Sequence, residues 1–184
     1  MVKTILAFNG AILLGCAIFF SKDSHTIITA LLLVLPFLDA NWRSHVFATK
    51  IFDNTRFYAP LAFLVMCYLV LFIIQSDMDY VTAAISVIVL IALPEEWFFR
   101  YYYLQQLKIG GRRAWVGNVA CSLLFTVVHI PAQGLAGLAV FVPSLIFGYA
   151  YQRTRSLIIV VLLHGLANLL YVTYFQSQFE SLIS

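Results

Sequence analysis

The stretch that decides the fold is YVTAAISVIVLIALPEEWFFRYYYLQQL, residues 80–107. It is almost entirely apolar, yet it carries Glu95, Glu96 and Arg100 near its centre. Apolar runs of about 17 to 25 residues cross a bilayer as helices, because every backbone N–H and C=O must be hydrogen-bonded within the segment. This run is slightly longer, so its helix must tilt or protrude. Ionised groups at such depth are costly unless paired, so these three residues are expected to have polar partners.

The rest of the chain has the same apolar character. Of its 184 residues, 62% are hydrophobic and 10% charged, whereas soluble domains have about 25% charged residues. A soluble fold of this size cannot bury so much apolar surface, so the bilayer is its solvent. The net charge of +3 is small, and the basic residues lie in separate clusters, which argues against nucleic-acid binding. Cys16, Cys67 and Cys121 lie in apolar runs and are expected to be small buried side chains.

The hydropathy pattern predicts an all-α, polytopic transmembrane bundle, a single integral-membrane domain over residues 1–184. The first run lacks an A-x-A cleavage site and is expected to stay as a span. The second is short and contains Pro36. We expect seven spans, at approximately 4–20, 26–40, 59–75, 80–107, 114–131, 135–151 and 156–175.

The basic residues segregate between alternate loops of this arrangement. Lys22 falls on one side, and the other side holds nine: Lys3, Arg43, Lys50, Arg56, Lys108, Arg112, Arg113, Arg153 and Arg155. Because Lys and Arg accumulate in cytoplasmic loops, the N-terminus is expected inside and the C-terminus outside. The segment 41–58, in which Trp42 and Phe47 lie among basic residues, is expected to be a cytoplasmic interfacial segment.

Ionisable residues at membrane depth fall on three of the predicted helices. Glu96 and Arg100 are four residues apart with the acid first, the favourable order for an ion pair on one helical face. Glu95 is rotated by about 100° from Glu96 and has no such partner on its own helix. Pro94, directly before it, is expected to kink the helix. The other two helices carry His129 and the pair His164 and Asn168.

These groups suffice for hydrolysis of an acyl group by water. A general base must take a proton from the water, and fixed donors must stabilise the oxyanion that forms. Glu95, the unpaired carboxylate, is the natural base, and His129 can share the water. His164 and the amide of Asn168, adjacent on one helical face, are the candidate oxyanion donors.

Three motifs then carry a resemblance. Glu95-Glu96-x-x-x-Arg100, Phe125-x-x-x-His129 and His164-x-x-x-Asn168 resemble, in order, the EExxxR, FxxxH and HxxxN motifs of the CAAX-prenyl-protease-like and bacteriocin-processing (Abi) intramembrane proteases. The resemblance covers about residues 80–175, the expected catalytic core. It implies a glutamate-dependent endopeptidase, with Glu95 as base, His129 on the water, His164 and Asn168 as oxyanion hole, and Glu96 with Arg100 in support. The compact length of 184 residues favours a bacterial enzyme over a eukaryotic one, so we expect it in a bacterial cytoplasmic membrane. Tyr101 replaces a glycine found in many members, which bears on substrate access and size.

Several alternatives stay open beside this hypothesis. No H-E-x-x-H or G-x-S-x-G motif is present, and Ser86, Ser122 and Ser144 are expected to be helix-packing hydroxyls. We expect no cofactor, although a metal held by Glu95, His129 and His164 is the nearest rival. A transporter or scaffold with a polar Glu/His cluster is another. The expected partners are the bilayer and a peptide or protein with a membrane-proximal tail: a prenylated CAAX tail, a leader or a sorting signal.

Overall fold

The computed structural model describes residues 2–19, 25–40, 42, 82, 84–107 and 111–172. Within these ranges the chain is helical and contains no strand, which confirms the predicted all-α class. Helix 84–106 is continuous and is divided below into three segments by its pitch. The elements are α1 (Val2–Phe19), α2 (His25–Val34), η1 (Leu35–Leu38), η2 (Val87–Ala92), α6 (Leu93–Glu96), η3 (Trp97–Leu104), η4 (Gly111–Arg113), α7 (Ala114–Gln133), η5 (Gly134–Val140), α8 (Phe141–Thr154) and α9 (Leu157–Leu170).

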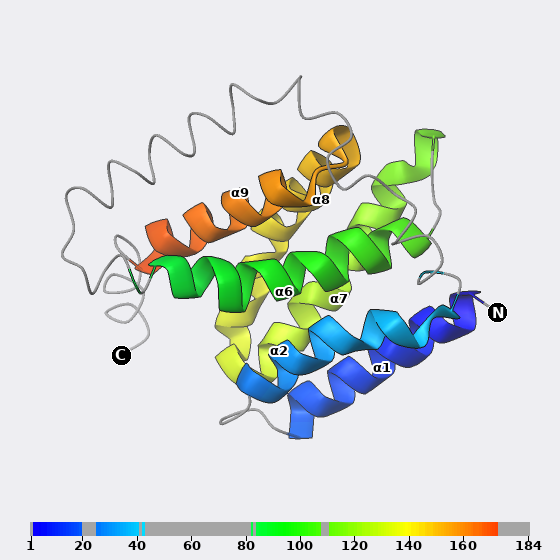
Figure 1. Cartoon of the computed structure of the whole chain (residues 1–184), viewed down its shortest axis with the longest axis horizontal. Helices are drawn as coiled ribbons and strands as arrows, with labels where there is room; N and C mark the ends of the chain where they lie inside the picture. Colours follow the sequence, from blue (N-terminus) through cyan, green and yellow to red (C-terminus); the bar gives the residue numbers. More distant parts are fainter. Residues whose placement is uncertain are drawn as a thin grey trace.

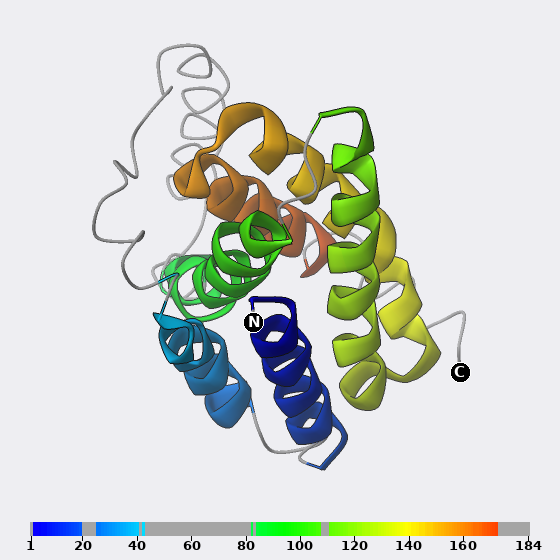
Figure 2. The ribbon, with the colours of Figure 1, turned by 90° about the vertical axis from the view of Figure 1, so that its right-hand side faces the viewer.

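Helix 84–106 lies at the centre of the described bundle (Figure 1). Its segments pack against α2 and η1 on one side, against α9 on another, and against α7 and α8. Figure 2 shows the helix nearly end-on, between the layer of α1 and α2 and the layer of α8 and α9. The helix that carries both glutamates therefore meets elements from both ends of the chain.

The pitch of this central helix widens on both sides of the glutamates. η2 and η3 are π-helical, and α6 between them is α-helical. The N–H of Leu93 bonds the carbonyl of Ile88, five residues earlier. Pro94 has no N–H, and its ring would clash with the carbonyl four residues before it, so a wider preceding turn accommodates the ring. Widened turns thus flank the acidic pair, and the kink expected at Pro94 stays a prediction.

The chain reverses after α7 at a glycine. Gly134 has φ 61°, the left-handed region that favours glycine, and its N–H bonds the carbonyl of Ile130. η5 follows, and α8 then packs along α7. Within the described ranges, Ala114–Thr154 is the one helical stretch long and apolar enough to cross a membrane by length and composition. This stretch folds back on itself, so α7 covers the segment expected at 114–131, and η5 with most of α8 covers the one expected at 135–151.

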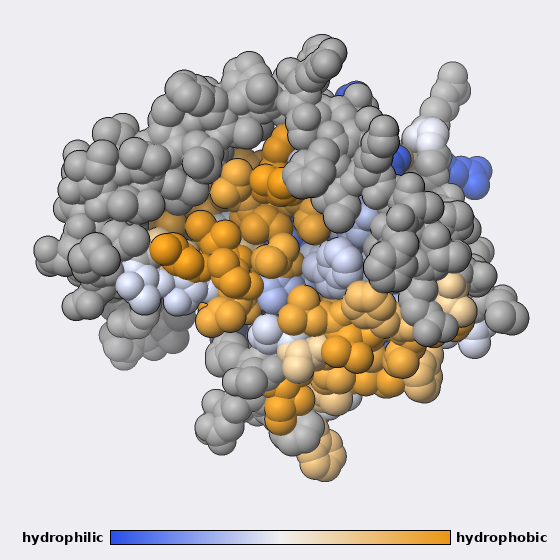
Figure 3. All heavy atoms as spheres, in the orientation of Figure 1, coloured by the Kyte–Doolittle hydropathy of each residue, from blue (hydrophilic) through white to orange (hydrophobic). Residues whose placement is uncertain are grey.

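Much of the outer surface of the described helices is apolar. Large side chains such as Leu90, Leu123, Leu135 and Ile146 are exposed, and Figure 3 shows apolar residues spread over the described part of one face. Shorter apolar helices are Thr4–Phe19, Ile27–Leu38 and Leu157–Leu170. Exposed apolar surface of this extent is typical of helices that face lipid.

Two segments predicted from the sequence, the span 59–75 and the interfacial segment 41–58, lie wholly or mostly outside the described residues. The expected span 59–75 lies outside the described residues, so the count of seven spans stays a prediction. Of the expected interfacial segment 41–58, the structure describes Trp42, which is 2% exposed. Its ring contacts those of Trp97, Tyr101 and Tyr102 at centroid distances of 5.2, 6.1 and 5.4 Å. The indole of Trp42 thus packs into the core beside η3, and the interfacial position of segment 41–58 stays a prediction.

Candidate active site

Glu96 is the most tightly held acidic group of the cluster. Its Oε2 lies 3.2 Å from Nε of Arg100, which confirms the ion pair expected from the i, i+4 spacing. Its Oε1 lies 2.8 Å from Nδ1 of His164 on α9, a contact that the spacing did not predict. The side chain of Glu96 is fully buried. Both carboxylate oxygens of Glu96 are therefore in contact with nitrogen atoms of other side chains.

Arg100 is held on several sides besides its ion pair. One terminal nitrogen, Nη2, donates to the carbonyl and the hydroxyl of Ser144 on α8, at 3.1 and 2.9 Å. The guanidinium carbon lies 5.1 Å from the ring centre of Phe125 and 6.0 Å from that of Phe99. The aromatic faces attract the cation, and the fully buried Glu96 neutralises it.

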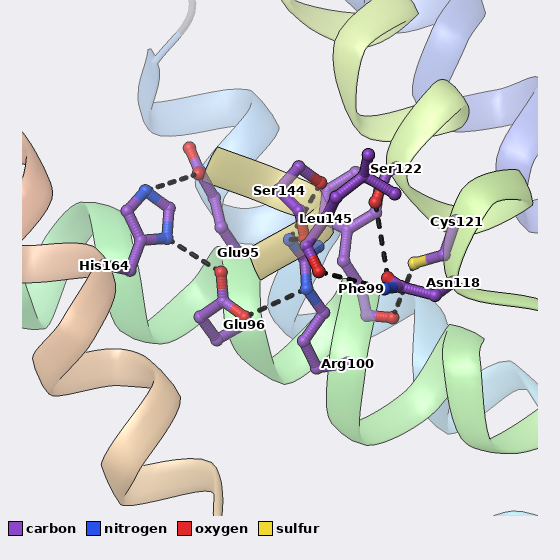
Figure 4. Close-up of polar contacts among 10 residues, drawn as sticks. All are labelled: Glu95, Glu96, Phe99, Arg100, Asn118, Cys121, Ser122, Ser144, Leu145 and His164. Carbon is purple, nitrogen blue, oxygen red and sulfur yellow. Dashed lines mark hydrogen bonds and ion pairs between the residues drawn. The ribbon is translucent and has the colours of Figure 1, made fainter. Parts of the chain in front are cut away.

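Glu95 has a different environment from its neighbour. Its Oε2 lies 3.6 Å from Nε2 of His164, and its Oε1 lies 3.9 Å from Nε2 of His129. Both separations exceed a hydrogen bond. The side chain is 16% exposed, whereas that of Glu96 is 0% exposed. Figure 4 shows the imidazole of His164 with one nitrogen toward each glutamate. The expected non-equivalence of the two acids is present in their contacts.

His129 is fixed from the backbone of its own helix. Its Nδ1 lies 2.7 Å from the carbonyl oxygen of Phe125. A carbonyl can only accept, so Nδ1 carries the hydrogen, and in the neutral ring Nε2 is an acceptor that faces Glu95. On the outer side η5 approaches closely: a Cβ on Gly137 would lie 3.0 Å from the carbonyl carbon of His129 and 3.0 Å from the nitrogen of Ile130. Gly137 therefore allows η5 to pack directly against the backbone of His129.

The position of His164 is set by the packing of α9 against α8 and against η2. The ring of Phe147 on α8 stacks on the imidazole at 4.9 Å between centroids, with 22° between planes. The next residue, Gly165, lies against η2, where an added Cβ would be 2.6 Å from Cγ1 of Ile88. This close approach brings the backbone of α9 near enough to helix 84–106 for His164 to reach both glutamates.

Asn168 is not joined to the cluster by a direct polar contact. It lies one turn beyond His164 on α9 and is half-buried. Within the described ranges, no hydrogen bond of its side-chain amide is present. The structure thus brings together Glu95, Glu96, Arg100, His129 and His164, and places Asn168 on the same helix as the last of these.

Ser144 and Phe147 were missed as site residues by the sequence analysis. Ser144 was expected to be a helix-packing hydroxyl, and its oxygen does join two helices, because it accepts from Arg100. Ser86 and Ser122 instead bond within their own helices, to the carbonyl of Thr82 and to the amide oxygen of Asn118. No local pattern separates these cases, since the partner of Ser144 lies 44 residues away in sequence.

The tyrosines that follow Arg100 pack away from the acidic pair. Tyr101 and Tyr102 are buried against Trp42, and the hydroxyl of Tyr102 accepts from the amide of Asn9 on α1 at 2.8 Å. The amide of Asn9 also reaches the carbonyl of Leu35 at 3.1 Å. The bulk at these positions is therefore accommodated by contacts with α1 and with Trp42.

The described cysteines are free thiols. Cys121 is 1% exposed, as expected, and its thiol donates to the carbonyl of Phe99 at 3.0 Å. Cys16 is a free thiol, half-buried, and Cys67 lies outside the described residues. Among those residues, no group of three or more His, Cys, Asp or Glu side chains is arranged to hold a metal ion.

The chain matches a known protein family over the region that carries the site. The family model described as type II CAAX prenyl endopeptidase Rce1-like matches residues 77–170, which include both glutamates, both histidines and Asn168. No curated protein and no solved structure matches the chain.

Proposed function

Because the chain belongs to the Rce1-like family of type II CAAX prenyl endopeptidases, we propose that it is a glutamate-dependent intramembrane endopeptidase with Glu95 as its general base. Family membership supports a membrane protease of the CAAX type. The choice of Glu95 as base and the roles of the other residues go beyond family membership, and the geometry of the site supports them.

The observation that carries this proposal is the difference between the two adjacent acids. Both oxygens of Glu96 contact nitrogens of Arg100 and His164 at 3.2 and 2.8 Å. The oxygens of Glu95 face Nε2 atoms at 3.6 and 3.9 Å, and its side chain is partly exposed. A general base needs an oxygen that can accept a proton from water. Glu95 has that capacity, whereas Glu96 is engaged on both oxygens.

A water molecule fits the gap between Glu95 and His129 on chemical grounds. Oε1 of Glu95 and Nε2 of neutral His129 are both acceptors, and they lie 3.9 Å apart. Two facing acceptors need a donor between them, and a water offers one hydrogen to each. In this proposal the lone pair of that water is directed at the peptide carbonyl.

The proposed reaction is acyl transfer to water. As the water oxygen bonds to the carbonyl carbon, Glu95 takes one of its protons, and the carbonyl oxygen becomes an oxyanion. Nε2–H of His164 and the amide of Asn168 donate to that oxyanion. When the carbon–nitrogen bond breaks, the proton on Glu95 passes to the leaving amine, and the acyl part remains as a carboxylic acid.

The charges of the site are consistent with this role for His164. Its Nδ1 contacts a carboxylate oxygen, so that nitrogen donates, and donation from Nε2 as well makes the ring a cation. The two positive groups, Arg100 and His164, then balance the two glutamates. A neutral set of four charges is the least costly arrangement at membrane depth.

The proposed substrate is a peptide or protein with a membrane-proximal tail. The family description names prenylated CAAX sequences, and leaders or C-terminal sorting signals would meet the same chemistry. A direct test uses the purified protein in lipid nanodiscs with an internally quenched, farnesylated CAAX peptide and its unprenylated counterpart. Termini of membrane proteins from wild-type cells and from a Glu95→Gln strain would identify natural substrates. Cleavage and termini that are the same in both would refute the proposal.

A further inference from the structure

Helix α8 carries none of the three motifs, yet it contacts two charged groups of the site. Ser144 accepts from Nη2 of Arg100 with its hydroxyl at 2.9 Å and with its carbonyl at 3.1 Å. One turn later, the ring of Phe147 stacks on His164. Both side chains are buried, at 0% and 5% exposure. Figure 4 shows Ser144 on the opposite side of Arg100 from Glu96.

The part of α8 that carries Ser144 is held in position by α7. The amide of Asn118 donates to the carbonyl of Leu145 at 2.9 Å. Its oxygen lies only 1.7 Å from where a Cβ on Gly148 would be, so no larger residue fits there without a shift. The two helices are therefore held at close range beside Ser144, which gives its hydroxyl a defined place.

Such an anchor matters because arginine and histidine side chains can otherwise rotate. The guanidinium is a planar fork, so fixing Nη2 also fixes the direction of Nε. In this site Nε faces Glu96 at 3.2 Å. Likewise, the stacked ring of Phe147 restricts the ring plane of His164. The contact of Nδ1 of His164 with Glu96 then directs Nε2 of the same ring toward Glu95. Each contact reduces the freedom of a group that surrounds Glu96.

We propose that α8 positions the catalytic groups: Ser144 orients Arg100, and Phe147 orients His164, so that Glu96 holds the imidazole with Nε2 toward Glu95. The inference rests on the proposed function. Both are positioning residues, because they act through Arg100 and His164 and not on the substrate.

The first experiment compares Ser144→Ala with Ser122→Ala. Both serines are 0% exposed, and the hydroxyl of Ser122 contacts Asn118 instead of Arg100. Cleavage of the farnesylated, quenched CAAX peptide is measured in nanodiscs. Ser144→Ala is expected to lower kcat about tenfold, since it removes a hydrogen bond to a charged group, and to leave KM unchanged. Ser144→Thr should restore kcat, and Ser122→Ala should retain it. Wild-type kcat in a folded Ser144→Ala protein would overturn the proposal.

A second measurement needs no activity. Melting temperatures in detergent are compared for Ser144→Ala, Arg100→Lys and the double variant. If Ser144 acts through Arg100, the two changes are not additive; additive changes would overturn the proposal. This cycle separates the two hypotheses, because equal cleavage by wild type and Glu95→Gln refutes the proposed function whatever the melting result.

If Ser144→Ala does not fold, Phe147→Leu provides a second test of the positioning role of α8. It keeps an apolar side chain and removes the ring that stacks on His164. It is expected to lower kcat and to displace the pH profile of kcat, because the imidazole loses a fixed orientation. A profile and a kcat equal to those of the wild type would contradict the role of α8.

Discussion

Nδ1 of His164 lies 2.8 Å from Oε1 of Glu96, so the histidine of α9 is held by the second of two adjacent glutamates. Its other nitrogen, Nε2, faces the first glutamate at 3.6 Å. One imidazole thus faces both acids, and its distance to Glu96 is shorter than its distance to Glu95. The different roles proposed for Glu95 and Glu96 give them different expected mutant phenotypes.

Glu95→Gln is expected to lower turnover by about 10²–10⁴-fold, the usual contribution of a general base. The fold should persist, because the amide has nearly the volume of the carboxylate and the contacts that it replaces are 3.6 and 3.9 Å long. Turnover of the quenched peptide and the melting temperature check this together. A folded variant with near-wild-type turnover would remove Glu95 from the role of base.

Glu96→Gln is expected to act mainly on stability. It leaves the buried charge of Arg100 without its acid, a defect of about 3–5 kcal/mol. Unfolding in detergent should show the loss. As a control, the double variant Glu96→Gln with Arg100→Gln should recover part of it, since no unpaired charge remains. A single variant as stable as the wild type would show that the ion pair is not needed.

Gly137→Ala is expected to disturb His129 through its backbone. The new methyl group would lie 3.0 Å from the carbonyl carbon of His129, so η5 or α7 must shift. A displacement of about 1 Å at a reacting group can reduce the rate about 10²-fold, so kcat should fall. Gly15→Ala is the matched control, because its Cβ meets nothing within 4 Å, and it should keep wild-type kcat. Equal activity of the two variants would argue against this positioning of His129.

Chelation is expected to leave activity unchanged. Arg100 next to Glu96 would oppose a bound dication, and both oxygens of Glu96 already have partners. The test is extensive treatment with a chelator, followed by metal analysis and the peptide assay. Stoichiometric zinc, with activity that returns only when zinc is restored, would instead make Glu95, His129 and His164 ligands.

The sequence predicts the N-terminus inside and the C-terminus outside. This follows from the basic residues and from the odd number of expected spans. Reporter fusions after Ser184 and within loop 76–79 should both show an external location. A cytoplasmic signal at either position would mean that the span count is wrong.

Contacts within one helix could be predicted from the sequence, and contacts between helices could not. The ion pair of Glu96 and Arg100 follows from a spacing of four residues on one face. The contact of Glu96 with His164 joins residues 68 positions apart. Motif resemblance grouped these residues without giving the distances or the nitrogen that each acid meets.

The π-helical turns near Pro94 and the packing of Trp42 also could not be predicted from the periodicity of the sequence. Pro94 predicted a distortion, but the π-helical pitch of η2 and η3 depends on how the widened turns pack. Trp42 lies among basic residues in sequence, and that pattern does not reveal that its indole packs against Trp97. In both cases tertiary packing decided the outcome, and a local window of sequence does not contain it.

The ion pair within helix 84–106 also bears on how the protein is made. A lone charge at the centre of a helix costs about 2.5–3.5 kcal/mol when the helix enters the membrane. Arg100 neutralises Glu96 from the same helix at 3.2 Å, so a span at the predicted residues 80–107 would enter with one uncompensated acid instead of three separate charges. The residues of α7, α8 and α9 that complete the site are synthesised later, so their contacts are not required at that step.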